Sequence, residues 1–228
     1  MKTDVHHSDL VSVARMTGIW YLSLAVSGVL GFLIFHPQVY VSNEPAETLA
    51  NLTERESLAR IRLLLEFAII IAQALTAVWF YRMFRTINEW GAWTLGIWGM
   101  MNSAVIMISP ISMGTALKIA NTANLSFENP VILIQLLQEI GANAWGVGSL
   151  FFGLWLIPMG YIIVTSKRMP IWLGRILIIG GGGYLLSTFL NYAGFTSPLL
   201  DALTIPATVG EFWMIGYLLI YGIRPPEE

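Results

Sequence analysis

Six stretches of predominantly apolar residues recur along this chain, and their length is the strongest constraint on its fold. A helix needs about 20 apolar residues to cross the roughly 30 Å hydrocarbon core of a bilayer. Each stretch has about that length, and together they occupy most of the sequence, at about 16–35, 60–82, 90–110, 142–165, 170–192 and 203–223. The sequence therefore predicts an all-α integral membrane bundle of six transmembrane helices, in a single membrane domain over residues 1–228.

The composition excludes several classes of soluble and metal-dependent protein. Only 11% of the residues are charged, whereas a soluble domain carries roughly 25% charge. The absence of cysteine excludes disulfides, thiolate nucleophiles and cysteine-ligated metal centres. His6 and His7 are expected on the opposite side of the membrane from His36, so the histidines predict no metal site. The net charge of −2 gives no excess of positive charge, which a protein that binds nucleic acid would need. We expect no cofactor, and the lipid bilayer as the surrounding partner.

Lysine and arginine are distributed unequally between the segments that connect the spans. Segments rich in these residues tend to stay in the cytoplasm. With both termini inside, the inner segments hold eight of the 12 such residues, which are Lys2, Arg15, Arg82, Arg85, Lys167, Arg168, Arg175 and Arg224. The outer segments hold Arg55, Arg60, Arg62 and Lys118. This distribution predicts cytoplasmic termini in a multi-pass protein of the cell membrane.

Local signals place the ends of two helices. Asn43-Glu44-Pro45 predicts the start of a short surface helix, because proline is favoured in the first helical turn. Thr53 and Glu56 have the spacing of a capping box, which predicts that the second span begins near Glu54. Pro130 predicts the start of a long helix that continues to about residue 165.

Several short motifs are shared with a known family. They are Phe151-Phe152-Gly153-Leu154, Gly160-Tyr161, Gly183-Tyr184-Leu185 and Gly210-Glu211-Phe212, together with Glu56-Ser57-Leu58-Ala59-Arg60. The pattern resembles the bacterial membrane family catalogued as domain of unknown function 4386 (DUF4386). The resemblance implies a six-helix fold in a bacterial cytoplasmic membrane, and it implies no activity.

The second span carries one polar stripe. Arg62, Glu66 and Gln73 fall on the same side of a helix that turns about 100° per residue. Arg62 and Glu66 are four residues apart, so they are also expected to form an ion pair that lowers the cost of placing each charge in the membrane. A structural ion pair and a ligand contact remain equally open, and the two roles are compatible.

Other polar and small residues follow the faces of the later helices. Glu139 and Asn143 lie near one face of the fourth span, and Tyr184, Thr188 and Asn191 share a face of the fifth, while Asn102 lies near the middle of the third. Glu211 is a lone carboxylate in an apolar helix, where it costs several kcal/mol unless it is protonated, paired or hydrated. The run 180–183 consists of glycine, which predicts close helix packing.

Most of these residues lie in the outer half of the predicted bundle, which suggests a polar cavity open to the outside. The candidate cavity residues are Arg60, Arg62, Glu66, Gln73, Asn102, Glu139, Asn143, Tyr184, Thr188, Asn191 and Glu211. The leading hypothesis is a protein that binds or transports a small polar or amphipathic ligand, lipid included. A non-catalytic membrane partner or stress component ranks nearly equal, and an intramembrane enzyme with a buried glutamate ranks lower. Homo-oligomer formation stays open.

The orientation is tested by single cysteines, for which the natural absence of cysteine provides a clean background. Cysteines at Ser42 and Asn124 should react with an impermeant thiol reagent added to intact cells, because both lie in outer connections. Cysteines at Asn88 and Ser166 should react only after the membrane is opened. Labelling at Asn88 together with protection at Ser42 would reverse the orientation.

Overall fold

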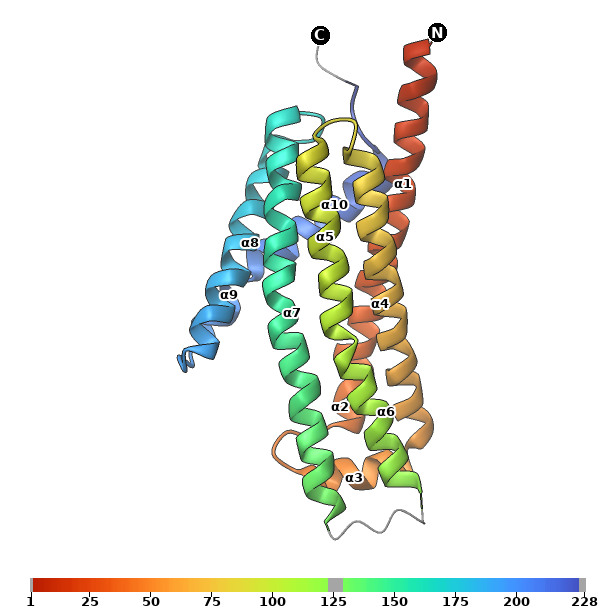
Figure 1. Ribbon diagram of the computed structural model, residues 1–228, viewed down its shortest axis with the longest axis vertical. Coiled ribbons are helices and arrows are strands. Elements are labelled where there is room, and N and C mark those ends of the chain that lie inside the picture. The colour runs from red at the N-terminus through yellow and green to blue at the C-terminus, as the bar shows by residue number, and fades with distance from the viewer. Residues whose placement is uncertain (1, 123–128, 226–228) are drawn as a thin grey trace. The chain divides into compact units, whose positions relative to one another are not determined.

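The computed structural model describes residues 2–122 and 129–225, with side chains from residue 8 onward. The labelling position Asn124 therefore lies outside the described residues. Figure 1 shows the order of the elements, which are helical throughout the described ranges. They are α1 (Lys2–Gly28), the π-helical segment η1 (Val29–Phe35), α2 (His36–Val39), α3 (Pro45–Glu54), α4 (Glu56–Phe84), α5 (Glu89–Ile106), α6 (Ile108–Asn121), α7 (Pro130–Ser166), α8 (Ile171–Tyr192), α9 (Pro198–Ala202) and α10 (Ile205–Ile220).

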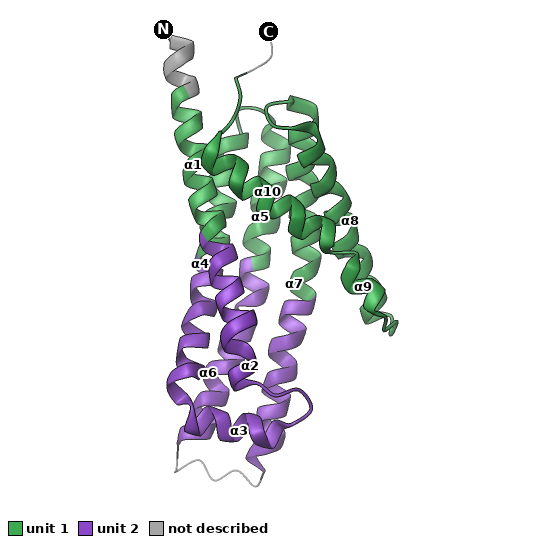
Figure 2. Ribbon diagram, turned by 180° about the vertical axis from the view of Figure 1, so that it is seen from behind, with its two compact units in different colours: residues 1–22, 72–102, 147–228 green, residues 23–71, 103–146 purple. Residues whose placement is uncertain are grey.

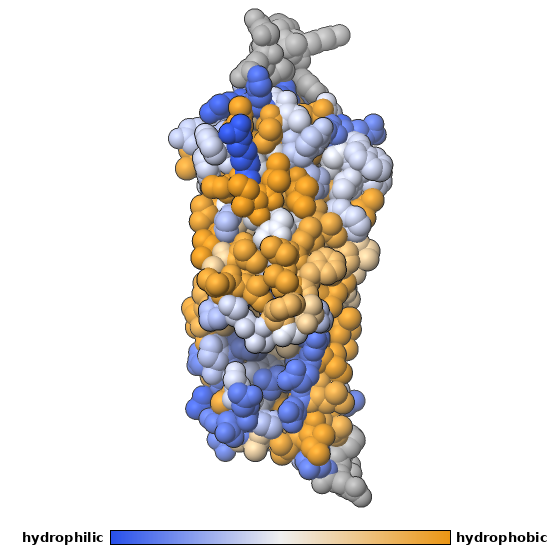
Figure 3. All heavy atoms as spheres, turned by 90° about the vertical axis from the view of Figure 1, so that its left-hand side faces the viewer, coloured by the Kyte–Doolittle hydropathy of each residue, from blue (hydrophilic) through white to orange (hydrophobic). Residues whose placement is uncertain are grey.

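Six of the described helical segments are long and apolar enough to span a membrane, which confirms the predicted fold class. They run over Ser8–Val39, Glu56–Phe84, Glu89–Asn121, Pro130–Ser166, Ile171–Tyr192 and Pro198–Ile220. Large apolar side chains are exposed on these helices, Leu33, Trp90 and Ile179 among them. Hydrophobic side chains cover much of the face seen in Figure 3. Such faces are stable in contact with lipid, so the protein belongs in a bilayer.

The chain forms two compact units, each built from segments that are distant in the sequence (Figure 2). Unit 1 comprises residues 1–22, 72–102 and 147–228, and unit 2 comprises residues 23–71 and 103–146. Since α1, α4, α5 and α7 each contribute to both units, neither unit is a continuous stretch of sequence.

Unit 2 contains an irregular part of the first span. In η1 the backbone hydrogen bonds join residues that are five positions apart, as in the bond from the N–H of His36 to the carbonyl of Gly31. A π-helical turn holds one residue more than an α-helical turn and often lies at a functional site. Pro37 lies two residues beyond the end of η1 and has no N–H to continue the preceding hydrogen-bond ladder. The irregularity changes which side chains of this span face the interior of unit 2.

The third span is interrupted between α5 and α6, also within unit 2. Met107 separates the two helices. Pro110 explains the interruption, because its missing N–H leaves the carbonyl of Ile106 without its usual partner four residues on. Fully or nearly fully buried apolar residues join α2, α3, α4, α6 and α7 in unit 2, and they are Val39, Leu52, Ala59, Met113, Ala116, Leu117 and Ile134.

The predicted helix ends are confirmed in two cases and wrong in one. The short surface helix is α3, and the long fourth helix runs from Pro130 to Ser166 without a break at Pro158. The capping box is wrong, because Thr53 lies inside α3 and its hydroxyl donates to the carbonyl of Leu49 at 3.1 Å. The second span accordingly begins at Glu56, after a turn at Arg55.

In unit 1 the glycine run of α8 makes the close contact that the sequence predicts, but not at every position. A Cβ atom placed on Gly183 would lie 2.0 Å from the carbonyl oxygen of Leu203, and one on Gly180 would lie 2.4 Å from the Cα of Ala207. One on Gly181 would meet the carbonyl oxygen of Gly153 at 2.8 Å. Gly182 has open space around it. Three of the four glycines therefore permit backbone contact with neighbouring helices.

This difference between adjacent glycines generates a prediction about stability. Gly183→Ala should destabilise the protein by about 1–3 kcal/mol, because the added methyl group overlaps backbone that must move. Gly182→Ala should be neutral or stabilising by up to about 1 kcal/mol, because alanine favours the helix. Thermal unfolding in detergent measures both variants. Equal melting temperatures for the two variants would contradict the assigned packing of α8.

Candidate functional site

Unit 2 buries an arginine and a glutamate together on α4. The side chains of Arg62 and Glu66 are 2% and 1% exposed, and Arg62 Nη2 donates to Glu66 Oε1 at 2.8 Å. The predicted pairing four residues apart is therefore present. A buried charge is tolerated in such surroundings only when it is paired and hydrogen-bonded, so the two residues stabilise each other.

Two further helices donate to the same carboxylate oxygen. Ser109 Oγ of α6 donates to Glu66 Oε1 at 2.8 Å, and Trp145 Nε1 of α7 donates to it at 3.2 Å. With Arg62, three donors from three helices converge on one oxygen. Hydrogen bonds to a charged acceptor contribute about 1.5–3 kcal/mol each. Glu66 Oε1 therefore acts as a polar link between α4, α6 and α7 in unit 2.

The irregular first span supplies an aromatic wall beside this pair. The guanidinium of Arg62 lies over the ring of Phe32, with its Cζ atom 4.4 Å from the ring centroid. Phe32 in turn meets Trp145 edge to face at 4.6 Å, and His36 stacks on Tyr40 at 5.0 Å between centroids. Burial, and to a lesser extent the nearby Glu66 carboxylate, raises the pKa of the Tyr40 phenol well above its usual range.

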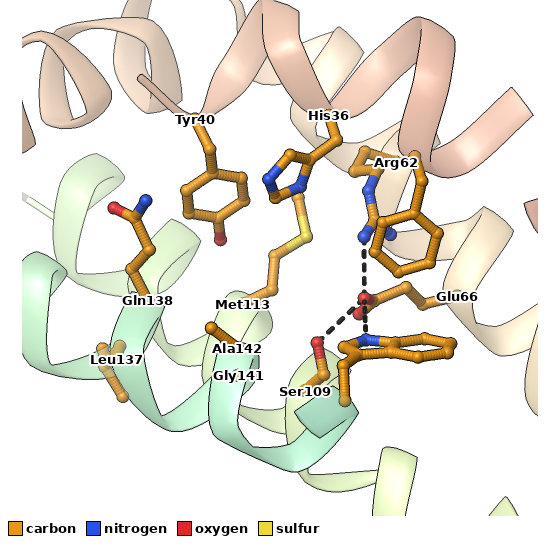
Figure 4. Close-up of a pocket in the computed structure, with 12 residues that line it drawn as sticks. His36, Tyr40, Arg62, Glu66, Ser109, Met113, Leu137, Gln138, Gly141 and Ala142 are labelled. Carbon is orange, nitrogen blue, oxygen red and sulfur yellow. Dashed lines mark hydrogen bonds and ion pairs between the residues drawn. The ribbon is translucent and has the colours of Figure 1, made fainter. Parts of the chain in front are cut away.

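These side chains surround a cavity of about 290 Å³ within unit 2 (Figure 4). Such a volume lies just below the range that is usual for small-molecule sites, which is roughly 300–1,000 Å³. Arg62 and Glu66 reach it from α4, and Gln138 from α7. The other lining residues are Phe32, His36, Tyr40, Ser109, Met113, Leu137, Gly141, Ala142 and Trp145. We refer to it as the unit 2 pocket.

Several buried polar atoms of this pocket have no hydrogen-bond partner among the described residues. They are Arg62 Nε and Nη1, Glu66 Oε2 and His36 Nδ1. An unsatisfied buried polar group costs about 1–3 kcal/mol, and more when it is charged. The pocket therefore offers donors on Arg62 and an acceptor on Glu66 to a molecule that enters it. Among the described residues, no group of three or more His, Asp and Glu is arranged for a metal ion.

Two other predicted cavity residues are buried in unit 1, and they do not line the unit 2 pocket. Gln73 of α4 and Asn102 of α5 are both fully buried. Their amide nitrogen and oxygen atoms find no partner within the described part of the chain. Both residues are confined by helix packing in unit 1, where a Cβ on Gly99 of α5 would lie 2.7 Å from the Cβ of Ala77 of α4.

Glu211 has a specific partner in unit 1 that the sequence does not reveal. The hydroxyl of Tyr21 donates to Glu211 Oε1 at 2.6 Å, which joins α1 to α10. The Tyr21 ring meets Phe80 and Trp155 edge to face, at 5.5 and 5.6 Å between centroids. The lone carboxylate of the sixth span is therefore hydrogen-bonded, as its cost in a membrane requires.

The remaining candidates do not belong to the unit 2 pocket. In unit 1, Tyr184 stacks on Phe152, Thr188 is buried and donates to the carbonyl of Tyr184, and Asn191 is exposed. In unit 2, Arg60 is exposed and pairs with Glu56. Glu139 and Asn143 are exposed on α7, where the Asn143 amide donates to the carbonyl of Glu139 at 2.9 Å.

Most residues of the unit 2 pocket escape prediction from the sequence, since only Arg62 and Glu66 are among the predicted cavity residues. His36, Tyr40, Ser109 and Trp145 carry no recognisable motif, and each is brought to Arg62 and Glu66 by the tertiary fold. One signal was available, because His36 and Ser109 each precede a proline within an apolar run. Proline in a membrane helix often marks an irregularity with freed backbone groups, so polar residues beside it are candidates for a site.

Comparisons with known proteins identify a family match over most of the chain. The model of the family described as domain of unknown function (DUF4386) matches residues 16–222. An uncharacterized protein of Archaeoglobus fulgidus is 28% identical over 69 residues, which cover 30% of this chain and 43% of that protein. The chain thus matches less than half the length of that relative. No solved structure matches the chain.

The buried ion pair generates a prediction about coupled stability. Arg62→Met should destabilise the protein by about 3–5 kcal/mol, because it leaves the Glu66 carboxylate buried without its cation. The double variant Arg62→Met/Glu66→Gln should lose less, because both charges are gone. Unfolding in detergent at neutral pH measures the difference.

The matched control is Arg60→Met, at a position two residues before Arg62 on the same helix. This change removes the exposed partner of Glu56. It should cost no more than about 1 kcal/mol. Equal losses for Arg62→Met and Arg60→Met, or a double variant less stable than Arg62→Met, would refute the coupling.

Proposed function

The chain belongs to the family described as domain of unknown function 4386, and we propose that its unit 2 pocket binds a small amphipathic molecule. The polar end of that molecule carries an acceptor for Arg62 and a donor for Glu66. Its apolar part lies against the aromatic side chains of η1, α2 and α7. The protein holds this ligand within the membrane. Transport of the ligand and signalling in response to it would both require this binding step.

The unsatisfied polar atoms of the ion pair are the observation that carries this proposal. Arg62 uses only Nη2 in its bond to Glu66, so Nε and Nη1 keep their hydrogens free of protein acceptors. Glu66 likewise uses only Oε1, so Oε2 accepts nothing from the described residues. An ion pair that served packing alone would gain from filling these positions with protein groups. These unpaired atoms support a hydrogen-bonding partner from outside the chain.

The chemistry of the pocket favours a ligand with both an acidic group and an N–H or O–H group. Arg62 binds carboxylate or phosphate oxygens through charge-assisted hydrogen bonds. Because the pair is neutral as a whole, a ligand that brings only negative charge would repel Glu66, and a donor on the ligand removes that penalty. Phe32, Tyr40 and Met113 offer apolar contact beside this polar end. A small amino acid derivative or hydroxy acid has this combination of groups.

The Lys/Arg distribution supports access from the outer side of the membrane. Tyr40 of the pocket is the first residue of the connection at residues 40–44, which this distribution assigns to the outside. Ligand would therefore enter from outside the cell. The alternatives are a purely structural role, in which no ligand is bound, and a catalytic role, in which the bound molecule is chemically altered. The experiment below distinguishes both from binding.

Native mass spectrometry of the gently purified protein tests the proposal. We expect a co-purifying molecule smaller than a phospholipid on the wild type and its absence from Ala142→Phe, because the larger ring occupies space in the pocket while Arg62 and Glu66 themselves are unchanged. In thermal shift assays with L-phenylalanine and phenyllactate, at least one should stabilise the wild type, by about 2.7 kcal/mol at 100 times its dissociation constant.

Two outcomes would separate binding from its alternatives. If the wild type carries no small molecule and both probes act equally on wild type and Ala142→Phe, the ion pair serves structure alone. If a bound molecule is recovered chemically altered only when Glu66 is intact, the enzyme alternative replaces binding. Arg60→Met serves as the control that should retain the ligand, because Arg60 lies outside the pocket.

A further inference from the structure

A second cavity forms in unit 1 where the last span ends. Gly222 adopts φ +71°, and its N–H donates to the carbonyls of Tyr217 and Leu218 at the end of α10. Such a left-handed glycine terminates a helix and redirects the chain. The chain then passes Val11 of α1, and the backbone N–H of Arg224 donates to the carbonyl of Arg168 at 3.0 Å. The turn therefore fixes Arg224 beside the connection between α7 and α8.

The cavity has a volume of about 540 Å³ and combines aromatic walls with one cation. Trp213, Tyr217 and Tyr221 of α10 line it together with Arg224. Arg224 is the charged residue among the lining side chains, and its Cζ atom lies 6.0 Å from the centroid of the Tyr217 ring. No carboxylate among the described residues forms an ion pair with Arg224. Within the described part of the chain, the guanidinium therefore has no competing carboxylate.

The place of this cavity in the fold points to the membrane interface. It lies at the C-terminal end of α10 and close to the start of α8, where both helices leave the apolar region. Two similar pairs occur near the ends of unit 1 helices, where Arg82 lies over Trp79 at 4.8 Å and Arg175 lies over Trp172 at 4.7 Å. Tryptophan, tyrosine and arginine concentrate at the level of lipid headgroups. Neither of these other arginines lines the cavity.

We propose that this cavity binds the headgroup of an anionic phospholipid from the adjacent leaflet. Arg224 binds the headgroup phosphate, the hydroxyl of the exposed Tyr221 donates to a lipid oxygen, and Trp213 lies along the glycerol and upper acyl chain. An apolar wall of this kind adds nothing to the binding of a free phosphate ion, and it favours a ligand with an attached hydrocarbon. The Lys/Arg distribution assigns this end to the cytoplasmic leaflet, where anionic lipids attract basic residues.

Native mass spectrometry after titration with phosphatidylglycerol and phosphatidylcholine of equal chain length tests this site. The wild type should bind one phosphatidylglycerol more tightly than any phosphatidylcholine. Arg224→Gln should weaken that first binding event about ten-fold, because it removes one charge-assisted contact with the phosphate. Arg224→Lys should retain most of the preference, because it keeps the charge.

Arg82→Gln is the matched control, since Arg82 also stacks on an aromatic ring in unit 1 but does not line the cavity. It should leave the first phosphatidylglycerol in place, and the melting temperature of each variant shows whether it is folded. Equal losses from Arg224→Gln and Arg82→Gln, or no preference of the wild type between the two lipids, would overturn the site. Displacement of the lipid by 10 mM inorganic phosphate would identify a phosphate site in place of a lipid site. Ala142→Phe should not affect this binding, so the two proposals fail independently.

Discussion

The burial of one guanidinium and one carboxylate in an apolar environment is the constraint on which unit 2 depends. Neither Arg62 nor Glu66 is tolerable there alone, and the remedy recruits the surrounding helices. Ser109 and Trp145 bring α6 and α7 to the carboxylate, while Phe32 brings η1 to the guanidinium. The buried Arg62–Glu66 pair therefore helps to specify which helices of unit 2 contact one another and at which residues they do so. The same requirement leaves unused donors and an unused acceptor facing a cavity.

The helices of the two units differ in how regular they are and in how closely their backbones approach. In unit 1 the close approaches of α8 rest on glycine, since Gly180 lets its backbone approach Ala207 of α10 and Gly183 lets it approach Leu203 just before α10. In unit 2 the helices are themselves irregular, with a π-helical segment before Pro37 and an interruption before Pro110. Irregular backbone in a membrane is tolerated where protein or a cavity covers it. Its occurrence on two walls of one pocket fits that rule.

The sequence predicts the helices well because crossing a bilayer demands a length and a polarity that are visible without any tertiary information. It also predicts the Arg62–Glu66 pair, since four residues along a helix fix their proximity. The contacts of Trp145 with Glu66 and of Tyr21 with Glu211 join residues 79 and 190 positions apart, and no local rule indicates them. The capping box failed for a local reason. The same sequence pattern allows Thr53 either to cap the N-terminus of α4 or to lie in the last turn of α3, and the structure has the second arrangement.

The π-helical segment in the first span also has a meaning for how this chain compares with its relatives. Such a segment holds one residue more than the α-helix would need over the same height. A relative that lacked one residue between Gly28 and Pro37 could therefore cover the same height as a regular α-helix, with the helix on both sides of the gap kept in its orientation. Only side chains within the segment, such as Phe32, would then change the side of the span that they face. A single-residue gap at this place in an alignment therefore marks a local change in the wall of the pocket, while the rest of the span is retained.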